Sequence, residues 1–253
     1  MNKQIKISIG YNHYGSFISD IPELFRNEQG QVIYNGRNQI RSFNDGSTKM
    51  IVKRFKKPDI VKKIIYSFFR KNKAEKAYKN AFEILKRGFN TPKPIAYIKE
   101  YKYGLMNCVY YICAYTDYEP IKNYLNCDNN FDKDLAVAFG IYVSELHKKG
   151  IIHNDLNCTN VLFKKIDGKY SFTLIDINRM QFKKEGMSFS KFQCLDNLTK
   201  FSEFNDAYKT VLSGYLDNRG WAENTYDEAI KIKRRHDTRW NRKKLITGLF
   251  KKK

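Results

Sequence analysis

The sequence lacks the features that mark membrane, secreted and metal-cluster proteins. Its longest apolar run, LAVAFGIYV, has nine residues and includes Gly140, whereas a membrane-spanning helix needs roughly 18. The first residues, MNKQIKISIGYNHYG, contain no apolar stretch, so we expect no secretory signal. Five cysteines, an odd number without a CxxC pair, favour free thiols in a reducing cytosol over disulfides or a zinc site. We therefore expect a cytoplasmic protein.

Acidic residues are scarce. The chain has 47 Lys and Arg against 26 Asp and Glu, a net charge of +21, and residues 231–253 alone hold eleven basic residues and one acid. Such a segment is either a solvated tail or a surface attracted to nucleic acid, anionic lipid or a phosphorylated substrate. Nucleic-acid binding needs aromatic side chains among the basic ones. The tail offers only Trp240 and Phe250, so we expect no nucleic-acid partner.

The first part of the chain predicts a β-rich region with one main helix. Two turn signals, Asn35-Gly36 and residues 44–46, separate three β-prone runs, which indicates an antiparallel meander over 31–55. Residues 72–88 have helical periodicity and end at a glycine. Two further strands are expected over 91–101 and 106–116, and a short helix over 19–26 with Pro22 in its first turn.

The second part predicts mainly helices. Residues 131–150 indicate a helix, which is followed by a polar loop, HNDLNCTN, and a hairpin over 160–176. The remainder, from about Gln181, is expected to be mostly helical. The chain is therefore expected to have an α+β fold with two lobes, residues 1–118 and residues 119–253.

Three oxygen-bearing side chains surround this loop and hairpin. Asp155 and Asn160 lie in the loop, and Asp176 ends the second strand. Because a hairpin brings its two ends together, we expect the three to meet at one mouth. Two carboxylates and an amide oxygen are hard ligands suited to Mg²⁺, which takes few protein ligands and leaves room for phosphate oxygens. Asp155 is placed to receive a proton from a hydroxyl, while Asn160 and Asp176 hold the metal.

A lysine and a glutamate complete the predicted site. Lys53 lies in an alternating strand between Val52 and Phe55, which are expected to be buried. On the following helix, Glu75 lies at the edge of the apolar face, whereas Glu83 falls on the solvent side. We therefore expect Glu75 to pair with Lys53 and to hold the lysine against nucleotide phosphates.

These residues carry a family resemblance. The order of VKRF, an inward Glu75, HNDLNCTN and LIDIN resembles the protein-kinase-like fold. The stretches KAEKAYKNAFEILKRGFNTPKPIAYI and HNDLNCTNVLF are most similar to the bacterial lipopolysaccharide-core kinases, which phosphorylate 3-deoxy-D-manno-octulosonic acid (Kdo) or heptose. The resemblance implies a two-lobed kinase-like fold that uses ATP and Mg²⁺. It also implies a lipid-linked sugar acceptor, the lipid A core, and a peripheral position at the inner face of the inner membrane, where the basic tail would meet anionic lipid.

The sequence also departs from protein kinases. Asn157 stands where eukaryotic protein kinases have Lys, which disfavours a peptide substrate, and no Ala-Pro-Glu segment is recognisable. The nucleotide-binding loop, YNGRN, has only Gly36. We expect His153 to shape the loop through backbone hydrogen bonds and Cys158 to serve as a small packing residue. Two alternatives stay open: a protein or antibiotic kinase of the same fold, and a non-catalytic binding module.

Overall fold

The structure is a computed structural model that describes residues 2–46, 48–68, 71–125 and 131–249. Cys127, Phe250 and the last three lysines lie outside these ranges. The chain forms two compact units. The first consists of the residues up to Asp117 together with Asp176–Arg179, and the second of Tyr118–Ile175 and the residues from Met180 onward. The division lies one residue from the expected one, but the short Asp176–Arg179 segment belongs to the first unit.

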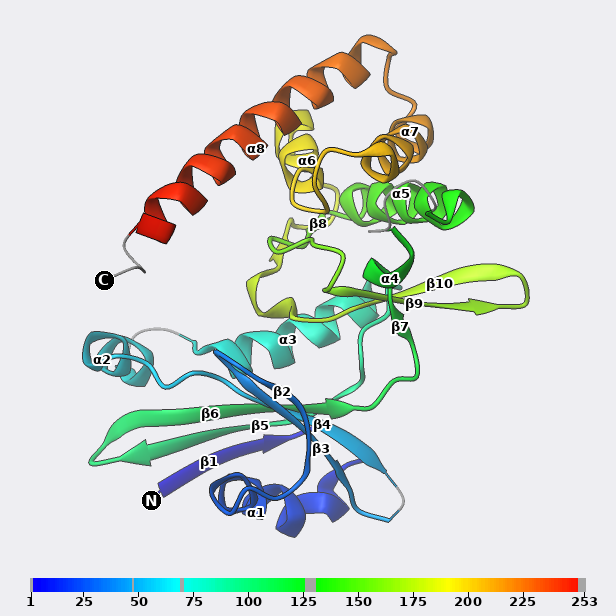
Figure 1. Ribbon diagram of the computed structural model, residues 1–253. Helices are drawn as coiled ribbons and strands as arrows, with labels where there is room; N and C mark the ends of the chain where they lie inside the picture. Colours follow the sequence, from blue (N-terminus) through cyan, green and yellow to red (C-terminus); the bar gives the residue numbers. More distant parts are fainter. Residues whose placement is uncertain (1, 47, 69–70, 126–130, 250–253) are drawn as a thin grey trace. The chain divides into compact units, whose positions relative to one another are not determined.

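A six-stranded antiparallel sheet is the framework of the first unit (Figure 1). The predicted meander is confirmed, because the second, third and fourth strands are neighbours in the sheet. The first strand was not predicted; it lies at an edge, and most of its side chains are exposed. The strands are β1 (Asn2–Ile7), β2 (Gln31–Asn35), β3 (Gln39–Asn44), β4 (Lys49–Arg54), β5 (Pro94–Lys102) and β6 (Leu105–Ala114), in the order β1-β5-β6-β4-β3-β2.

Helix α1 (Gly15–Arg26), preceded by the short helix η1 (Asn12–Tyr14), packs on this sheet. The expected start near residue 19 is wrong, because the buried positions Ile18, Ile21 and Phe25 extend the apolar face back by a turn. Pro22 therefore lies inside the helix and is itself buried. Burial of that face offsets the backbone hydrogen bond that the proline cannot make.

Two more helices belong to the first unit, α2 (Ile60–Phe68) and α3 (Lys73–Lys86). Helix α2 was not predicted, whereas α3 confirms the expected helix. Its N-cap is Asn72, whose side-chain oxygen accepts the backbone N–H of Glu75 at 3.0 Å. The chain leaves α3 through Gly88, which has a φ of +84° and thus the left-handed conformation that glycine favours.

The second unit contains the expected hairpin and helices. Strands β9 and β10 pair directly and β7 adds a third strand, while β8 and β11 form a separate pair. None of the helices among the described residues is both long and apolar enough to cross a bilayer. The elements are β7 (Glu119–Pro120), α4 (Lys122–Leu125), α5 (Lys133–Lys148), β8 (Ile151–Ile152), β9 (Val161–Ile166), β10 (Lys169–Leu174), β11 (Gln181–Phe182), α6 (Lys191–Leu198), α7 (Asp206–Arg219) and α8 (Asn224–Leu249).

Two glycines let α5 and α7 approach at backbone distance. A Cβ at Gly140 of α5 would lie 2.8 Å from the backbone nitrogen of Tyr215, and a Cβ at Gly214 of α7 would lie 2.7 Å from the carbonyl oxygen of Val137. Real Cβ atoms do not come this close to backbone atoms. The core of the second unit therefore depends on the absence of side chains at this crossing.

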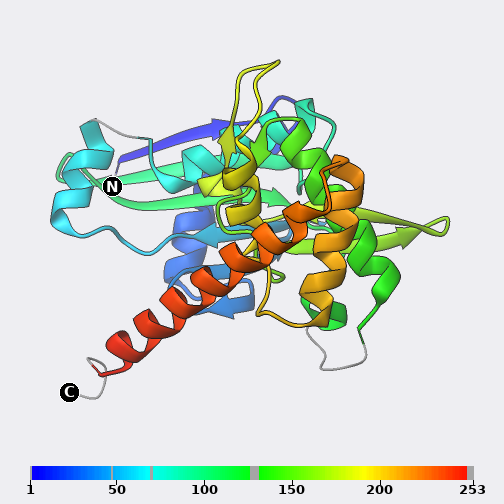
Figure 2. The same cartoon turned by 90° about the horizontal axis from the view of Figure 1, so that it is seen from above.

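Helix α8 packs on α6 and α7 with its first half and then continues beyond them (Figure 2). Within the first half, Ala229 and Lys233 are buried. From Thr238 to Leu245 every residue is exposed. Residues 238–245 of the basic segment thus form an exposed extension of a helix whose base belongs to the core of the second unit.

We expect Gly140→Ala to destabilise the second unit, because the added methyl group must push α5 and α7 apart. Overpacking of this kind typically costs about 1–3 kcal/mol. The measurement is urea unfolding followed by circular dichroism. Gly15→Ala is the matched control, since a Cβ at that helical glycine has only one neighbour within 4 Å, the Ile7 Cδ1 atom at 3.9 Å. Equal stability of Gly140→Ala and the wild type would contradict the close helix crossing.

Candidate functional site

His153 fixes the backbone of the polar loop. Its Nε2 atom lies 2.9 Å from the carbonyl oxygen of Ile175, and its Nδ1 atom lies 3.2 Å from the backbone nitrogen of Asp155. A carbonyl only accepts and a backbone N–H only donates, so the ring carries its proton on Nε2. The prediction that His153 shapes the loop is confirmed. The ring ties Asp155 to the end of the β9–β10 hairpin.

Asp155 is oriented by two asparagines. The Asn157 Nδ2 atom donates to a carboxylate oxygen of Asp155 at 3.2 Å, and the Asn160 Nδ2 atom donates to the Asp155 carbonyl at 2.8 Å. The side-chain oxygen of Asn157 accepts in turn from the backbone N–H and the hydroxyl of Thr159. The neutral amide at 157 therefore takes the place of a lysine beside this carboxylate and steers it without neutralising its charge.

The hairpin carries the chain from Asn160 to Asp176. Val161 and Leu174 face each other across the two strands, and the Ile175 N–H donates to the Asn160 carbonyl at 3.0 Å. Asn160 and Ile175 thus flank the open end of the hairpin, and Asp176 is the next residue along the chain. This confirms the expected hairpin. That Asn160 and Asp176 hold a metal ion, with Asp155 as the proton acceptor beside them, stays a prediction.

Asp176 is held in an unusual backbone conformation. Its φ is +53°, in the left-handed region that non-glycine residues seldom adopt. Its Oδ1 atom accepts from Lys53 Nζ and from Asn178 Nδ2, each at 2.6 Å, and the next carbonyl, that of Ile177, accepts from Asn80 of α3 at 2.7 Å. Such outliers persist where surrounding contacts over-determine them, and they cluster at functional sites. Helix α3 and strand β4 together fix this segment, which includes the short helix η2 (Ile177–Arg179).

The expected ion pair between Lys53 and Glu75 is wrong. Lys53 pairs with Asp176, whereas Glu75 pairs with Lys79 and Lys99, each at 2.9 Å. Helix α3 begins at Lys73, so Glu75 lies in its first turn. There Lys99 of β5 reaches the Glu75 carboxylate. Strand β6 lies between β5 and β4, the strand that carries Lys53. Burial would raise the pKa of Glu75, but the ammonium groups of Lys79 and Lys99 outweigh it and lower this pKa.

Gly36 lies in the turn between β2 and β3, as expected for a nucleotide-covering loop. Its backbone N–H donates to the carbonyl of Asn38 at 3.1 Å, so in this structure that N–H serves the turn. The neighbouring Arg37 extends toward the start of α3, where its charge acts on Lys73. Contact between Gly36 and a nucleotide stays a prediction.

The predicted metal ligands suit a hard cation. Asp176 supplies a carboxylate, and Asn160 supplies an amide oxygen because its amide nitrogen is engaged by the Asp155 carbonyl. No group of three or more His, Cys, Asp and Glu side chains in the described part of the chain is arranged to hold a metal. Each of these ligand types suits Mg²⁺, which takes much of its shell from water and phosphate. That Asp176 of the first unit and Asn160 of the second hold one ion stays a prediction.

A buried polar chain supports the loop from behind. Asn197 of α6 donates to the His153 carbonyl at 2.8 Å and accepts, through its side-chain oxygen, from His147 Nε2 at 3.0 Å. The other ring nitrogen of His147 lies 2.9 Å from the hydroxyl of Tyr215. All three side chains are at least 99% buried. Burial lowers the pKa of His147 to about 4, so the ring is neutral at physiological pH.

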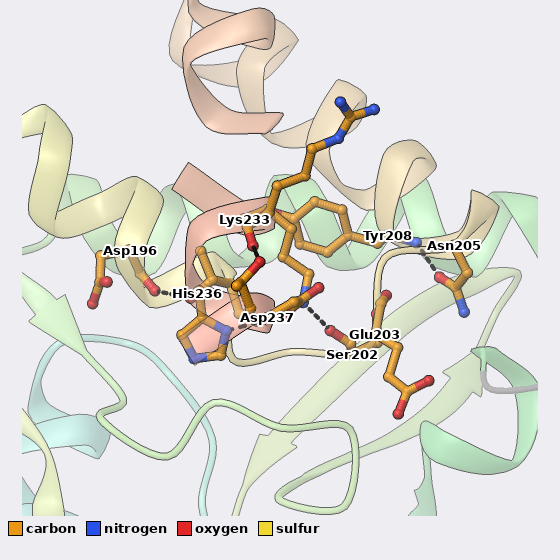
Figure 3. Close-up of polar contacts among 11 residues, drawn as sticks. Asp196, Ser202, Glu203, Asn205, Tyr208, Lys233, His236 and Asp237 are labelled. Atoms are coloured by element: carbon orange, nitrogen blue, oxygen red, sulfur yellow. Dashed lines mark hydrogen bonds and ion pairs between the residues drawn. The ribbon is translucent and has the colours of Figure 1, made fainter. Parts of the chain in front are cut away.

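Lys233 of α8 holds the segment that follows α6 (Figure 3). Its side chain is 1% exposed, and its ammonium donates to the carbonyls of Thr199 and Ser202 and to the Asp237 carboxylate, at 3.0, 2.5 and 2.6 Å. Between those two carbonyls, that of Phe201 accepts the N–H of Cys158 in the polar loop. Burial lowers the pKa of Lys233, and Asp237 opposes that shift. The base of α8 is thereby linked to the loop that carries Asp155.

The six predicted site residues are divided between the units. Asp155 and Asn160 belong to the second unit, and the first unit contains Gly36, Lys53, Glu75 and Asp176. Sequence reasoning missed the supporting residues Asn197 and Lys233, because neither lies in a motif and only the fold brings them to the loop. Burial raises the pKa of the Cys158 thiol, which fits a packing role.

Comparison with known proteins gives one family and one fold. The model of the lipopolysaccharide kinase (Kdo/WaaP) family matches residues 25–231. The solved structure of WaaP in complex with acyl carrier protein is similar at a TM-score of 0.56 and 12% sequence identity, over 89% of this chain and 99% of that chain. At this identity the likeness concerns the fold, and it supports the α+β, protein-kinase-like class. No curated protein matches the chain by sequence.

We expect the stability of the second unit to fall as the pH is lowered from about 6.5 to about 4. His147 has its pKa lowered to about 4 in the folded protein, while an unfolded histidine titrates near 6.5. Between these values the unfolded state binds more protons, so stability is complete above the upper value and declines below it. The full effect is on the order of 3 kcal/mol.

The measurement is the Tm of wild type and His147→Gln from pH 7.5 to 4.5. Glutamine keeps a donor toward Asn197 but does not titrate, so the advantage of the wild type should shrink as the pH falls. His13→Gln, at an exposed position, controls for loss of a histidine. A constant difference between wild type and His147→Gln would contradict a neutral buried ring.

Proposed function

Because the chain belongs to the lipopolysaccharide kinase (Kdo/WaaP) family, we propose that it transfers the γ-phosphoryl group of ATP to a sugar hydroxyl of the lipopolysaccharide inner core, on Kdo or heptose. The observation that carries this proposal is the Asp155 carboxylate. It lies in a loop fixed by His153 and is oriented by the Asn157 amide. A carboxylate that is steered but not neutralised by its neighbour is suited to accept a proton.

The proposed reaction is a direct phosphoryl transfer. The acceptor hydroxyl loses its proton to the Asp155 carboxylate as its oxygen bonds to the γ-phosphorus. The bond between that phosphorus and the β–γ bridging oxygen breaks, and ADP leaves with the electron pair. A positioned base of this kind contributes typically 10²–10⁴-fold to the rate. The Asn157 amide orients the Asp155 carboxylate through a hydrogen bond of 3.2 Å and, unlike a lysine, brings no positive charge to it.

The first unit is proposed to bind the nucleotide. Lys53 supplies a cation for the phosphates, and the turn at Gly36 covers them. Asp176 keeps Lys53 in place at 2.6 Å, and Glu75 serves instead to join α3 to β5 through Lys99. Mg²⁺, held by Asp176 and Asn160, would neutralise charge on the transferring group when bound.

Two observations favour a sugar acceptor over the alternatives of the same fold. The family match extends over residues 25–231, which includes every proposed site residue, and Asn157 replaces the lysine typical of peptide kinases. A protein or antibiotic kinase remains the alternative activity. The intact set of Lys53, Asp155, Asn160 and Asp176 argues against a non-catalytic binding module.

We also propose that the exposed half of α8 binds an anionic membrane surface, which would place the enzyme at the inner face of the inner membrane beside its lipid-linked acceptor. Trp240 is 52% exposed and Leu245 is 70% exposed. A basic residue near an anionic leaflet contributes about 1 kcal/mol, within a screening distance of about 8 Å. Exposed basic residues of α8 are Lys231, Arg234, Arg235, Arg239, Arg242, Lys243 and Lys244.

We expect Asp155→Asn to lower kcat by roughly 10²–10⁴-fold while leaving ATP affinity nearly unchanged, because the variant loses only the proton acceptor. Asp176→Asn should instead weaken Mg²⁺-dependent ATP binding. The measurements are turnover on purified lipid A core, with mass spectrometry of the added phosphate, and calorimetric titration with ATP and Mg²⁺. Asp167→Asn, the same change in the β9–β10 turn, is the control. Full activity of Asp155→Asn would refute the proposed function.

We expect reversal of four charges, at Arg239, Arg242, Lys243 and Lys244, to release the protein from anionic vesicles without loss of activity on a soluble sugar acceptor. Co-sedimentation with phosphatidylglycerol vesicles at low and moderate salt measures the binding. A control with Glu at the exposed Lys6, Lys86, Lys102 and Lys169 makes the same change in net charge elsewhere. If both variants bind equally, α8 is not the contact.

A further inference from the structure

A cavity of about 560 Å³ lies within the first unit, beside the turn that is proposed to cover the nucleotide. Its wall combines the β2–β3 turn, the segment after β4, the start of α3 and the end of η2. Neither Lys53 nor Asp176 is part of that wall. The lining side chains that the argument uses are Arg37, Lys56, Lys57, Asn72, Lys73 and Arg179.

Asn72 is part of the cavity wall and has an unused hydrogen-bond donor. The side chain is 98% buried, and its oxygen caps α3 by accepting the Glu75 N–H at 3.0 Å. With the oxygen thus engaged, the Nδ2 atom faces no hydrogen-bond acceptor among the described residues. A buried donor without an acceptor costs about 1–3 kcal/mol, so its persistence suggests an acceptor from outside the chain.

The electrostatics of the wall favour an anion. Five basic side chains line the cavity, against one carboxylate, Asp59, among its described residues. In the described part of the chain, Arg37, Lys57 and Lys73 form no ion pair. The pKa of Lys73 is lowered, first by burial and then by the charges of Arg37 and Arg179. The positive N-terminus of the 14-residue α3 adds to this field.

We propose that this cavity is a second anion site, which binds a phosphate-type oxyanion separately from the nucleotide phosphates. A tetrahedral oxyanion offers several acceptors at once, to the Asn72 amide, to the ammonium of Lys73 and to the guanidinium of Arg37. Helix N-termini with nearby basic side chains suit such groups. The cavity volume is large compared with one phosphate, so a phosphorylated molecule also fits the wall.

The test uses the full chain with inorganic phosphate as the probe, at constant ionic strength, and measures the Kd by calorimetry. Lys73→Gln should weaken phosphate binding roughly tenfold or more, the loss expected for one charged hydrogen-bond donor. Lys76→Gln, an exposed position on the same helix, should bind like the wild type. Equal Kd values for these two variants would overturn the proposal.

The variant Asn72→Asp distinguishes a loss of phosphate binding from a loss of folding. Aspartate caps a helix as well as asparagine does, so α3 should keep its cap, and a negative charge at this helix N-terminus is favourable. The same charge removes the donor and repels phosphate. We expect a Tm without phosphate at least equal to the wild type, together with at least tenfold weaker phosphate binding. Retained phosphate affinity in a folded Asn72→Asp protein would overturn the proposal.

A last experiment tests whether phosphate and nucleotide compete for one site. A second titration with phosphate uses protein that is saturated with ADP and Mg²⁺, and a parallel titration uses Lys53→Met. Unchanged phosphate affinity in both supports a separate site. Competition by ADP, or loss of phosphate binding in Lys53→Met, would assign the phosphate to the nucleotide site and refute the separate one. Because phosphate binding needs no turnover, this result is independent of whether the chain phosphorylates a sugar.

Discussion

The position of the Asp155 loop depends on one buried amide. Asn197 joins the backbone of His153 to the ring of His147, and neither group has access to water. In such surroundings an unmade hydrogen bond costs more than a made one contributes. Loss of any one hydrogen bond in this chain is therefore expected to destabilise the fold. The neutral state of His147 follows from the same burial. The loop at the surface is therefore tied to the core behind it, as the base proposed at Asp155 would require.

In the first unit, a lysine and an aspartate replace the expected lysine–glutamate clamp. Asp176 holds Lys53 while itself constrained by Asn178 and by a left-handed backbone. Helix α3 contributes through Asn80, which grips the Ile177 carbonyl, and not through Glu75. The charge that would meet the nucleotide phosphates is thus organised by the Asp176–Arg179 segment. The basic cavity lies at the N-terminus of the same helix, where Asn72 and Lys73 line it.

Much of the fold and of the loop was predictable, for physical reasons that differ from element to element. The hairpin and α3 are specified by local signals, namely alternation, turn residues, a capping asparagine and a terminal glycine. The role of His153 followed from its place between a helix and a strand. The partner of Glu75 was predicted wrongly, because helical periodicity gives the face on which a residue lies but not the strand that this face meets. Glu75 lies in the first turn of α3, where it pairs with Lys99 of β5.

The residues that sequence reasoning missed share another property. Asn197 and Lys233 are polar residues in helices whose periodicity gives no sign that they are buried, and their partners are carbonyl groups more than thirty residues away in the sequence. Asn72 was included in the predicted helix, but its amide nitrogen only becomes conspicuous once the cap has engaged its oxygen. Long-range backbone acceptors leave no pattern in the local sequence.

Lys233 divides the basic helix α8 into two parts with different roles. Up to Asp237 the helix is a component of the core, because the Lys233 ammonium donates to the carbonyls of Thr199 and Ser202. Between these two residues lies Phe201, whose carbonyl accepts the N–H of Cys158. Beyond Asp237 the helix is a surface appendage. A lineage could therefore lengthen, shorten or recharge the outer turns freely, whereas the inner turns must change together with the Asp155 loop. Variation along this single helix should show a step at one residue, with its fixed part on the side of the active loop.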